Sequence, residues 1–211
     1  MSVQKFDHVS LKVLITGCSG TGKTTLFEKL VRAEKAPRKF FFDHQGEFSA
    51  RFGLKPIFEP DELPEATARG GNICFDPVKY WPGRTPEAFA FFCDYVFTVA
   101  EKIKGRKILV ADELQKLCDG RDIPQELLTV LDTGRRYQLD CFFIAQAPNT
   151  IHNRVRNQLT RVFTFRQSDG NAVKYLSENG FDEEKVRALK KGEYLWIDLA
   201  SGESGAGGKA F

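Results

Sequence analysis

Short apolar runs alternate with longer amphipathic stretches along this chain. The apolar runs are rich in β-branched and aromatic residues, which is typical of strands. The strands that this pattern predicts are Leu11–Thr16, Lys39–Asp43, Asn72–Phe75, Lys107–Ala111, Asp140–Ala145, Arg161–Arg166 and Glu193–Asp198. Lys107–Ala111 is almost wholly apolar, as expected of a strand buried on both faces of a parallel sheet, whereas the alternation in Arg161–Arg166 predicts a strand nearer the edge.

The stretches between these runs repeat apolar residues every three to four positions, which predicts helices. Phe89, Cys93 and Val96 show this spacing in the longest stretch. The predicted helices are Lys23–Ala33, Pro86–Lys104, Pro124–Tyr137, a stretch from about Asn149 that carries Ile151, Val155 and Leu159, Gly170–Glu178 and Asp182–Lys190. Strands that alternate with helices predict an α/β fold with a mostly parallel central sheet and helices on both of its faces.

Length and composition indicate one folded unit. The chain has 211 residues, of which 42% are hydrophobic, and this excludes intrinsic disorder. We expect a single domain over residues 1–200. Residues 201–211 are rich in glycine and serine and predict a flexible tail.

Cysteine usage and hydropathy indicate a reducing, aqueous environment. The five cysteines are odd in number and form no C-x-x-C pair, so neither a disulfide framework nor a zinc site fits. The first ten residues lack the features of a signal peptide. The longest apolar stretch, Ala88–Ala100, is interrupted by Asp94 and is shorter than the ~20 residues of a membrane span. We therefore expect no transmembrane segment in the chain itself.

A glycine-rich G-x4-G-K-T pattern joins the first predicted strand to the first predicted helix. Glycines let successive backbone N–H groups point into one concavity that holds phosphate, and the helix N-terminus adds partial positive charge. The alternative is a glycine-rich turn without a ligand. The strand–loop–helix context favours a nucleoside triphosphate site formed by Gly17, Cys18, Ser19, Gly20, Thr21, Gly22, Lys23, Thr24 and Thr25.

Within this motif, Lys23 supplies a cation for the β- and γ-phosphates, and the Thr24 hydroxyl is a ligand for Mg2+. The predicted strand Lys107–Ala111 leads into Asp112 and Glu113, at the strand end where open α/β sheets bind ligands. Asp112 is the second candidate Mg2+ ligand. Glu113 is the candidate base that polarises a water for attack on the γ-phosphate.

Gln146 ends the next buried strand, which we expect beside the strand of the phosphate loop. Its amide is a candidate contact for the γ-phosphate or the attacking water, and a loop glutamine without a role is the alternative.

Arginine is concentrated in one part of the chain. Residues 133–166 contain six arginines, no lysine and one acid, a local charge of +5 in a chain whose net charge is +3. Arginine favours bidentate phosphate contacts. Arg135 and Arg136 are candidates for a finger that reaches the γ-phosphate of a neighbouring subunit. Arg154 and Arg156 lie off the apolar stripe of their stretch and suit nucleic acid or an interface, with solvated surface arginines as the alternative.

Four segments together resemble the FtsK–HerA superfamily of P-loop ATPases. These segments read GCSGTGKTT, FFFDHQGEF, ILVADE, and GRRYQLDCFFIAQAPNTIHNRVRNQLTRVFTFR. The second is similar to the D-P-H-G-E-Y segment of HerA-type proteins, and the closing LKKGEYLWIDL is similar to the family's last Leu-x-x-Gly-Glu-Tyr strand. Among members, the genome-packaging ATPases of tailless, membrane-containing viruses are most like this chain in size.

The resemblance implies an ASCE-type sheet, with ATP and Mg2+ bound between the subunits of a pentameric or hexameric ring, and double-stranded DNA moved through the pore. It also implies capsid or viral-membrane proteins at the packaging vertex as partners. The expected location is the host cytoplasm or the virion vertex. The hypothesis is an ATP-hydrolysing DNA translocase. The alternative is a small-molecule kinase or a nucleotide-dependent switch, against which the arginine cluster argues. Residues 49–70 and 76–87 remain candidates for pore loops or capsid-docking loops.

Overall fold

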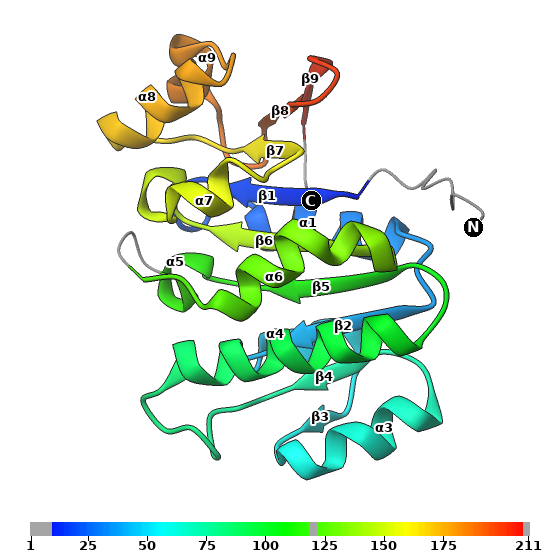
Figure 1. Cartoon of the computed structure of the whole chain (residues 1–211). Coiled ribbons are helices and arrows are strands. Elements are labelled where there is room, and N and C mark those ends of the chain that lie inside the picture. Colours follow the sequence, from blue (N-terminus) through cyan, green and yellow to red (C-terminus); the bar gives the residue numbers. More distant parts are fainter. Residues whose placement is uncertain (1–9, 119–121, 209–211) are drawn as a thin grey trace, which may run out of the picture.

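Nine strands form one sheet in the computed structural model, which describes residues 10–118 and 122–208. Their order across the sheet is β3-β4-β2-β5-β6-β1-β7-β8-β9 (Figure 1). The strands are β1 Lys12–Thr16, β2 Arg38–Phe42, β3 Pro56–Ile57, β4 Ile73–Phe75, β5 Lys107–Ala111, β6 Leu139–Ala145, β7 Arg161–Thr164, β8 Tyr194–Asp198 and β9 Ser204–Gly207.

The sheet is mostly parallel, as predicted. Every neighbouring pair from β3 to β7 in the spatial order runs parallel, and only β8 and β9 pair antiparallel with their neighbours. The register pairs Thr16 at the end of β1 with Ala145 at the end of β6, and Ala111 at the end of β5 with Phe143. The carboxyl ends of these three strands therefore meet at one edge, where parallel sheets bind ligands.

Strand side chains alternate between two apolar cores, one on each face of the sheet. On β2, Phe40 and Phe42 belong to the larger core and Phe41 to the smaller one. The larger core packs against α4 (Thr85–Lys102) and α6 (Gln125–Thr133), and the smaller one against α1 (Lys23–Ala33) and α2 (Glu47–Phe52). Figure 1 shows α4 and α6 in front of the sheet and α1 behind it. Helices cover both faces, as expected of an α/β fold.

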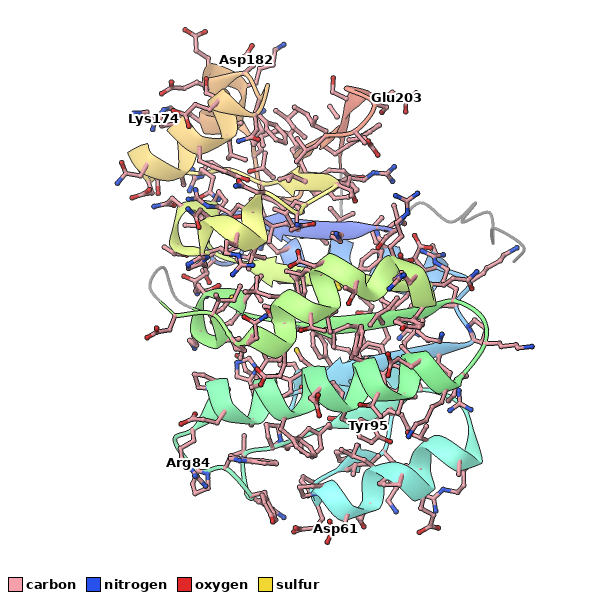
Figure 2. All side chains as sticks on the ribbon, in the orientation of Figure 1. Asp61, Arg84, Tyr95, Lys174, Asp182 and Glu203 are labelled. Atoms are coloured by element: carbon pink, nitrogen blue, oxygen red, sulfur yellow. The ribbon has the colours of Figure 1, made fainter. Side chains whose placement is uncertain are left out.

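Shorter helices complete the structure. They are α3 Leu63–Arg69, α5 Leu114–Leu117, α7 Asn153–Arg156, α8 Gly170–Glu178 and α9 Glu183–Ala188, with 3-10 turns η1 Pro60–Glu62, η2 Gly134–Tyr137 and η3 Pro148–Thr150. The hydroxyl of Tyr95 on α4 lies 2.6 Å from that of Thr67 on α3, which joins the two helices (Figure 2). Asp182, also labelled in Figure 2, accepts a hydrogen bond from the backbone N–H of Lys185 and caps α9.

Two predicted helices are interrupted. The prediction of one helix over Pro124–Tyr137 is wrong at its end, because α6 stops at Thr133 and the chain continues as η2. The helix predicted from about Asn149 is also wrong. Ile151 and His152 adopt extended backbone angles between η3 and α7. The apolar spacing of this stretch is real, since Ile151 and Val155 are buried, but two separate turns present it to the core.

The end of the chain confirms one prediction and corrects another. Strand β7 lies nearer the edge than β5, as predicted, and β8 and β9 lie beyond it in the sheet. The tail predicted for residues 201–211 is wrong at Ser204–Gly207, which form β9, while residues 209–211 lie outside the described range. Glycine has a steric role here, since a Cβ on Gly205 would lie 2.8 Å from Nε1 of Trp196 on β8. The glycines on which the prediction of a flexible tail was based allow the edge strand β9 to pass beneath the aromatic rings of β8.

Residues 49–70, which we considered as a loop, contain the end of α2 together with β3, η1 and α3. Among the helices of residues 10–118 and 122–208, none combines the length and the hydropathy that a membrane span requires.

Candidate active site

The glycine-rich loop follows β1 and leads into α1, as the sequence predicts. Gly17, Gly20 and Gly22 have φ values of +146°, +72° and +115°. The backbone N–H of Gly17 donates to the carbonyl of Gln146 at 3.1 Å, and that of Cys18 donates to the carbonyl of Arg166 at 3.0 Å. The loop is thus anchored to the ends of both strands that flank β1.

A cavity of about 410 Å³ opens above this loop. The predicted site residues that line it are Ser19, Gly20, Gly22, Lys23, Thr24, Thr25, Asp112, Glu113 and Gln146. Gly17, Cys18 and Thr21 belong to the loop but do not line the cavity. Thr21 is buried, and its hydroxyl donates to the carbonyl of Cys18 at 2.7 Å, which stiffens the loop from below.

Lys23 lies over the loop. Its ammonium donates to the carbonyls of Gly17 at 2.8 Å and Cys18 at 2.9 Å. Burial lowers the pKa of Lys23, and the nearby Asp112 carboxylate offsets part of that effect. An ammonium held beside backbone N–H groups at a helix N-terminus forms a site for an anion.

The two acids that follow β5 differ in environment. Asp112 accepts the backbone N–H of Glu113 at 2.6 Å, and burial raises the pKa of Asp112 to about 6. A buried carboxylate without a cation is costly, so this position suits a metal ion. The Thr24 hydroxyl and the Asp112 carboxylate line the same cavity, and such hard oxygen donors fit Mg2+.

Glu113 has a left-handed backbone, with φ of +46°, at the start of α5. Non-glycine residues rarely adopt this conformation, and it turns the side chain away from the direction that the strand would give it. Oε1 of Glu113 lies 3.4 Å from the amide nitrogen of Gln146. The structure therefore brings the ends of β5 and β6 together at the cavity.

The other carboxylate oxygen of Glu113 has two basic neighbours. It forms an ion pair with Lys116 on α5 and lies 4.0 Å from Nε2 of His44. His44 is buried against the ring of Phe42, and burial lowers its pKa, which favours the neutral imidazole. The sequence analysis assigned no role to His44. Its only sequence signal is its position in the DHQGEF segment directly after β2.

The same segment shapes one wall of the cavity. The buried carboxylate of Asp43 accepts the backbone N–H groups of Phe48 at 3.0 Å and Ser49 at 2.8 Å, and so caps α2. Three side chains from this region, Gln45, Glu47 and Arg51, line the cavity. The sequence analysis did not single them out as site residues.

The arginines of residues 133–166 lie on or just after three elements, η2, α7 and β7. Arg135 and Arg136 are exposed on η2, directly before β6, whereas Gln146 follows the last residue of that strand. Seven strand residues at ~3.3 Å each separate these ends by about 23 Å. The structure does not bring Arg135 and Arg136 to the cavity of their own chain.

Three further arginines have partners within the chain. Arg154 lies 3.8 Å from Asp132, and Arg161 pairs with Asp198 at 2.8 Å. Arg156, which lies off the apolar stripe, is partly exposed, and its guanidinium lies 4.8 Å from the ring centre of Tyr175.

A strand–glycine loop–helix unit, with two acids at the end of β5 on the far side of β6, defines a P-loop nucleotide-binding protein. The chain matches the family model described as "ATPase family associated with various cellular activities (AAA)" over residues 13–167, and it belongs to that family. It is a P-loop ATPase. Comparison with curated protein sequences gave no significant match.

Solved structures share this fold at low sequence identity. The genome packaging NTPase B204 from Sulfolobus turreted icosahedral virus 2, in complex with ATP-gammaS, has a TM-score of 0.75 and 17% identity over 96% of this chain and 98% of that chain. The DNA-packaging ATPase B204 from Sulfolobus turreted icosahedral virus has a TM-score of 0.72 and 19% identity over 92% and 95%. VirB4 of Thermoanaerobacter pseudethanolicus has a TM-score of 0.66 and 13% identity over 92% and 88%. These likenesses confirm the predicted resemblance at the level of the fold.

Proposed function

We propose that this chain is the ATP-driven motor that moves double-stranded DNA during packaging of a viral genome. The observation that carries the proposal is that the charged groups are divided between the two ends of the central strands. The acids and Gln146 lie at the cavity, at the carboxyl ends of β5 and β6. Arg135 and Arg136 lie next to the opposite, amino-terminal end of β6. Such a division suits a subunit that shares its active site with a neighbour.

In this proposal Lys23 and the loop N–H groups hold the phosphates of ATP. Thr24 and Asp112 hold Mg2+, which would neutralise charge on the β- and γ-phosphates. Glu113 accepts the proton of a water whose oxygen attacks the γ-phosphorus, and the bond from that phosphorus to the leaving ADP oxygen breaks. Gln146 orients the water or contacts the γ-phosphate, since its amide lies 3.4 Å from Glu113.

Arg135 or Arg136 of one subunit would complete the site of the next in a pentameric or hexameric ring. The fold shared with two packaging ATPases supports double-stranded DNA as the transported polymer. Capsid or viral-membrane proteins at the packaging vertex would be further partners, and the motor would act in the host cytoplasm or at that vertex. Residues 1–200 would constitute the ATPase domain.

The first test replaces the proposed base. Glu113→Gln should bind ATP normally but hydrolyse it about 10²–10⁴-fold more slowly, because general base catalysis contributes that much. Glu65→Gln, an exposed acid on α3, is the matched control and should keep the wild-type rate. Normal turnover by Glu113→Gln would contradict the assignment.

The second test adds long duplex DNA to the wild-type protein and measures the ATPase rate at saturating ATP. A translocase should hydrolyse ATP faster when it engages DNA. A rate that stays constant would count against the DNA part of the proposal and leave the ATPase assignment intact.

The third test mixes Glu113→Gln with the double variant Arg135→Ala/Arg136→Ala. A shared site should recover part of the activity, because mixed rings contain interfaces with one intact acid and one intact arginine turn. Full activity from a strict monomer would instead support the kinase or switch alternative.

A further inference from the structure

One residue of the cavity lining comes from far along the chain. Lys191 lies in the segment between α9 and β8, whereas the other lining residues come from positions 19–146. Neither the G-x4-G-K-T motif nor the acidic pair predicts that Lys191 lies at this cavity.

The segment that carries Lys191 is attached to the phosphate loop. The backbone N–H of Gly192, the next residue, donates to the carbonyl of Thr21 at 2.9 Å. On either side, Lys190 and Glu193 form a closed turn, since the backbone N–H of Lys190 donates to the Glu193 carboxylate at 2.9 Å and the backbone N–H of Glu193 donates to the Lys190 carbonyl at 3.0 Å. The backbone of Lys191 is therefore held beside the tip of the loop.

A second contact reinforces this attachment from below. The ring of Tyr194, the first residue of β8, packs against the ring of Phe165 with centres 5.6 Å apart. Phe165 in turn lies directly under Gly17, where a Cβ would come within 2.6 Å of it. The phosphate loop and the start of β8 thus rest on the same side chain.

The charges of the cavity leave a role for a further cation. Three of its lining residues are basic, namely Lys23, Arg51 and Lys191. A triphosphate carries more negative charge than Lys23 and one Mg2+ neutralise.

We propose that Lys191 is a second phosphate-binding lysine, whose ammonium contacts the phosphate chain of the bound nucleotide. The inference rests on the proposed nucleotide function of the cavity. The carboxyl-terminal part of the chain then contributes directly to the site through a side chain on a preformed turn. A nucleotide bound there would also strengthen the contact between the phosphate loop and β8.

The test compares two adjacent lysines. Lys191→Ala should weaken binding of ATPγS about tenfold, the equivalent of one charge-assisted hydrogen bond, with kcat changed much less than KM. Lys190→Ala is the matched control, because Lys190 is exposed and does not line the cavity. Lys191→Arg should keep most of the affinity. Added salt should weaken ATPγS binding less in Lys191→Ala than in the wild type, which a purely structural role would not produce.

The outcomes separate this inference from the function on which it rests. If Lys23→Met abolishes ATPγS binding while Lys191→Ala binds like the wild type, Lys191 has no phosphate contact and the inference is wrong. If Lys23→Met also binds normally, the cavity is not the nucleotide site and the proposed function fails with it. Equal losses in Lys190→Ala and Lys191→Ala, or loss of folding in both, would also overturn the specific role of Lys191.

Discussion

At Gly17 the backbone has a φ of +146°, and the Cβ of Phe165 lies 2.6 Å from the position that a Gly17 Cβ would occupy. Glycine is therefore required at this position for two reasons, the backbone conformation of the turn and the close approach of Phe165, the residue after β7. Gly20 differs, because its φ of +72° disfavours a side chain, while within residues 10–118 and 122–208 no atom other than those of its chain neighbours lies within 4 Å of its Cβ position. Glycine is thus needed at these two positions of one motif for different physical reasons.

This difference gives a matched pair of variants. Gly17→Ala should lower the free energy of unfolding by about 1–3 kcal/mol beyond Gly20→Ala, because it adds a steric overlap to backbone strain. Gly20→Ala should cost only about 1 kcal/mol, the strain of a left-handed alanine. Urea unfolding of both variants measures the difference, and equal losses would contradict the contact with Phe165.

At the scale of elements, β5 links η2, the turn that carries Arg135 and Arg136, to the proposed catalytic acids. Lys107 at its first position is buried, and its ammonium donates to the carbonyls of Tyr137 at 2.7 Å and Ala100 at 3.1 Å. Its backbone N–H donates to the carbonyl of Gln138 at 2.8 Å. The start of β5 therefore fastens η2 to the end of α4, and the other end of β5 leads into Asp112.

Removing the ammonium should loosen that junction. Lys107→Met should lower the free energy of unfolding by about 1–3 kcal/mol, because two carbonyls lose a buried donor. Lys102→Met, an exposed lysine on α4, is the control and should change stability little. Thermal unfolding measures both. A Lys107→Met protein as stable as the wild type would show that water or relaxation replaces both hydrogen bonds.

At the scale of the molecule, the proposed arginine finger and the cavity lie at opposite ends of β6. About 23 Å of strand separates them, so one chain cannot bring its own Arg135 or Arg136 to its own Glu113 without unfolding β6. The remaining arginines of residues 133–166 are spread over α7 and β7, and several pair within the chain. In the proposed mechanism, the active site of one subunit is therefore complete only beside another subunit.

The ATPase rate per chain should therefore rise with protein concentration, because assembly supplies the arginine turn. In the Arg135→Ala/Arg136→Ala variant the rate should stay low at every concentration. Steady-state ATPase assays, paired with native mass measurements at the same concentrations, check both expectations. A wild-type rate per chain that is independent of concentration, from particles of monomer mass, would contradict the shared site.

Local patterns in the sequence were enough to predict the α/β class, the glycine loop between β1 and α1, and the polar residues that end β5 and β6. These features depend on side-chain periodicity and on a few residues adjacent in the chain, so they are visible without a fold. Only the tertiary structure brought His44 to Glu113, Lys191 to the loop and Phe165 beneath Gly17, and it dispersed arginines that are clustered in sequence. Each of these outcomes depends on packing between segments that lie tens to more than a hundred residues apart. The same is true of β9, whose glycines signal a tail by composition but form a strand because the rings of β8 cover them.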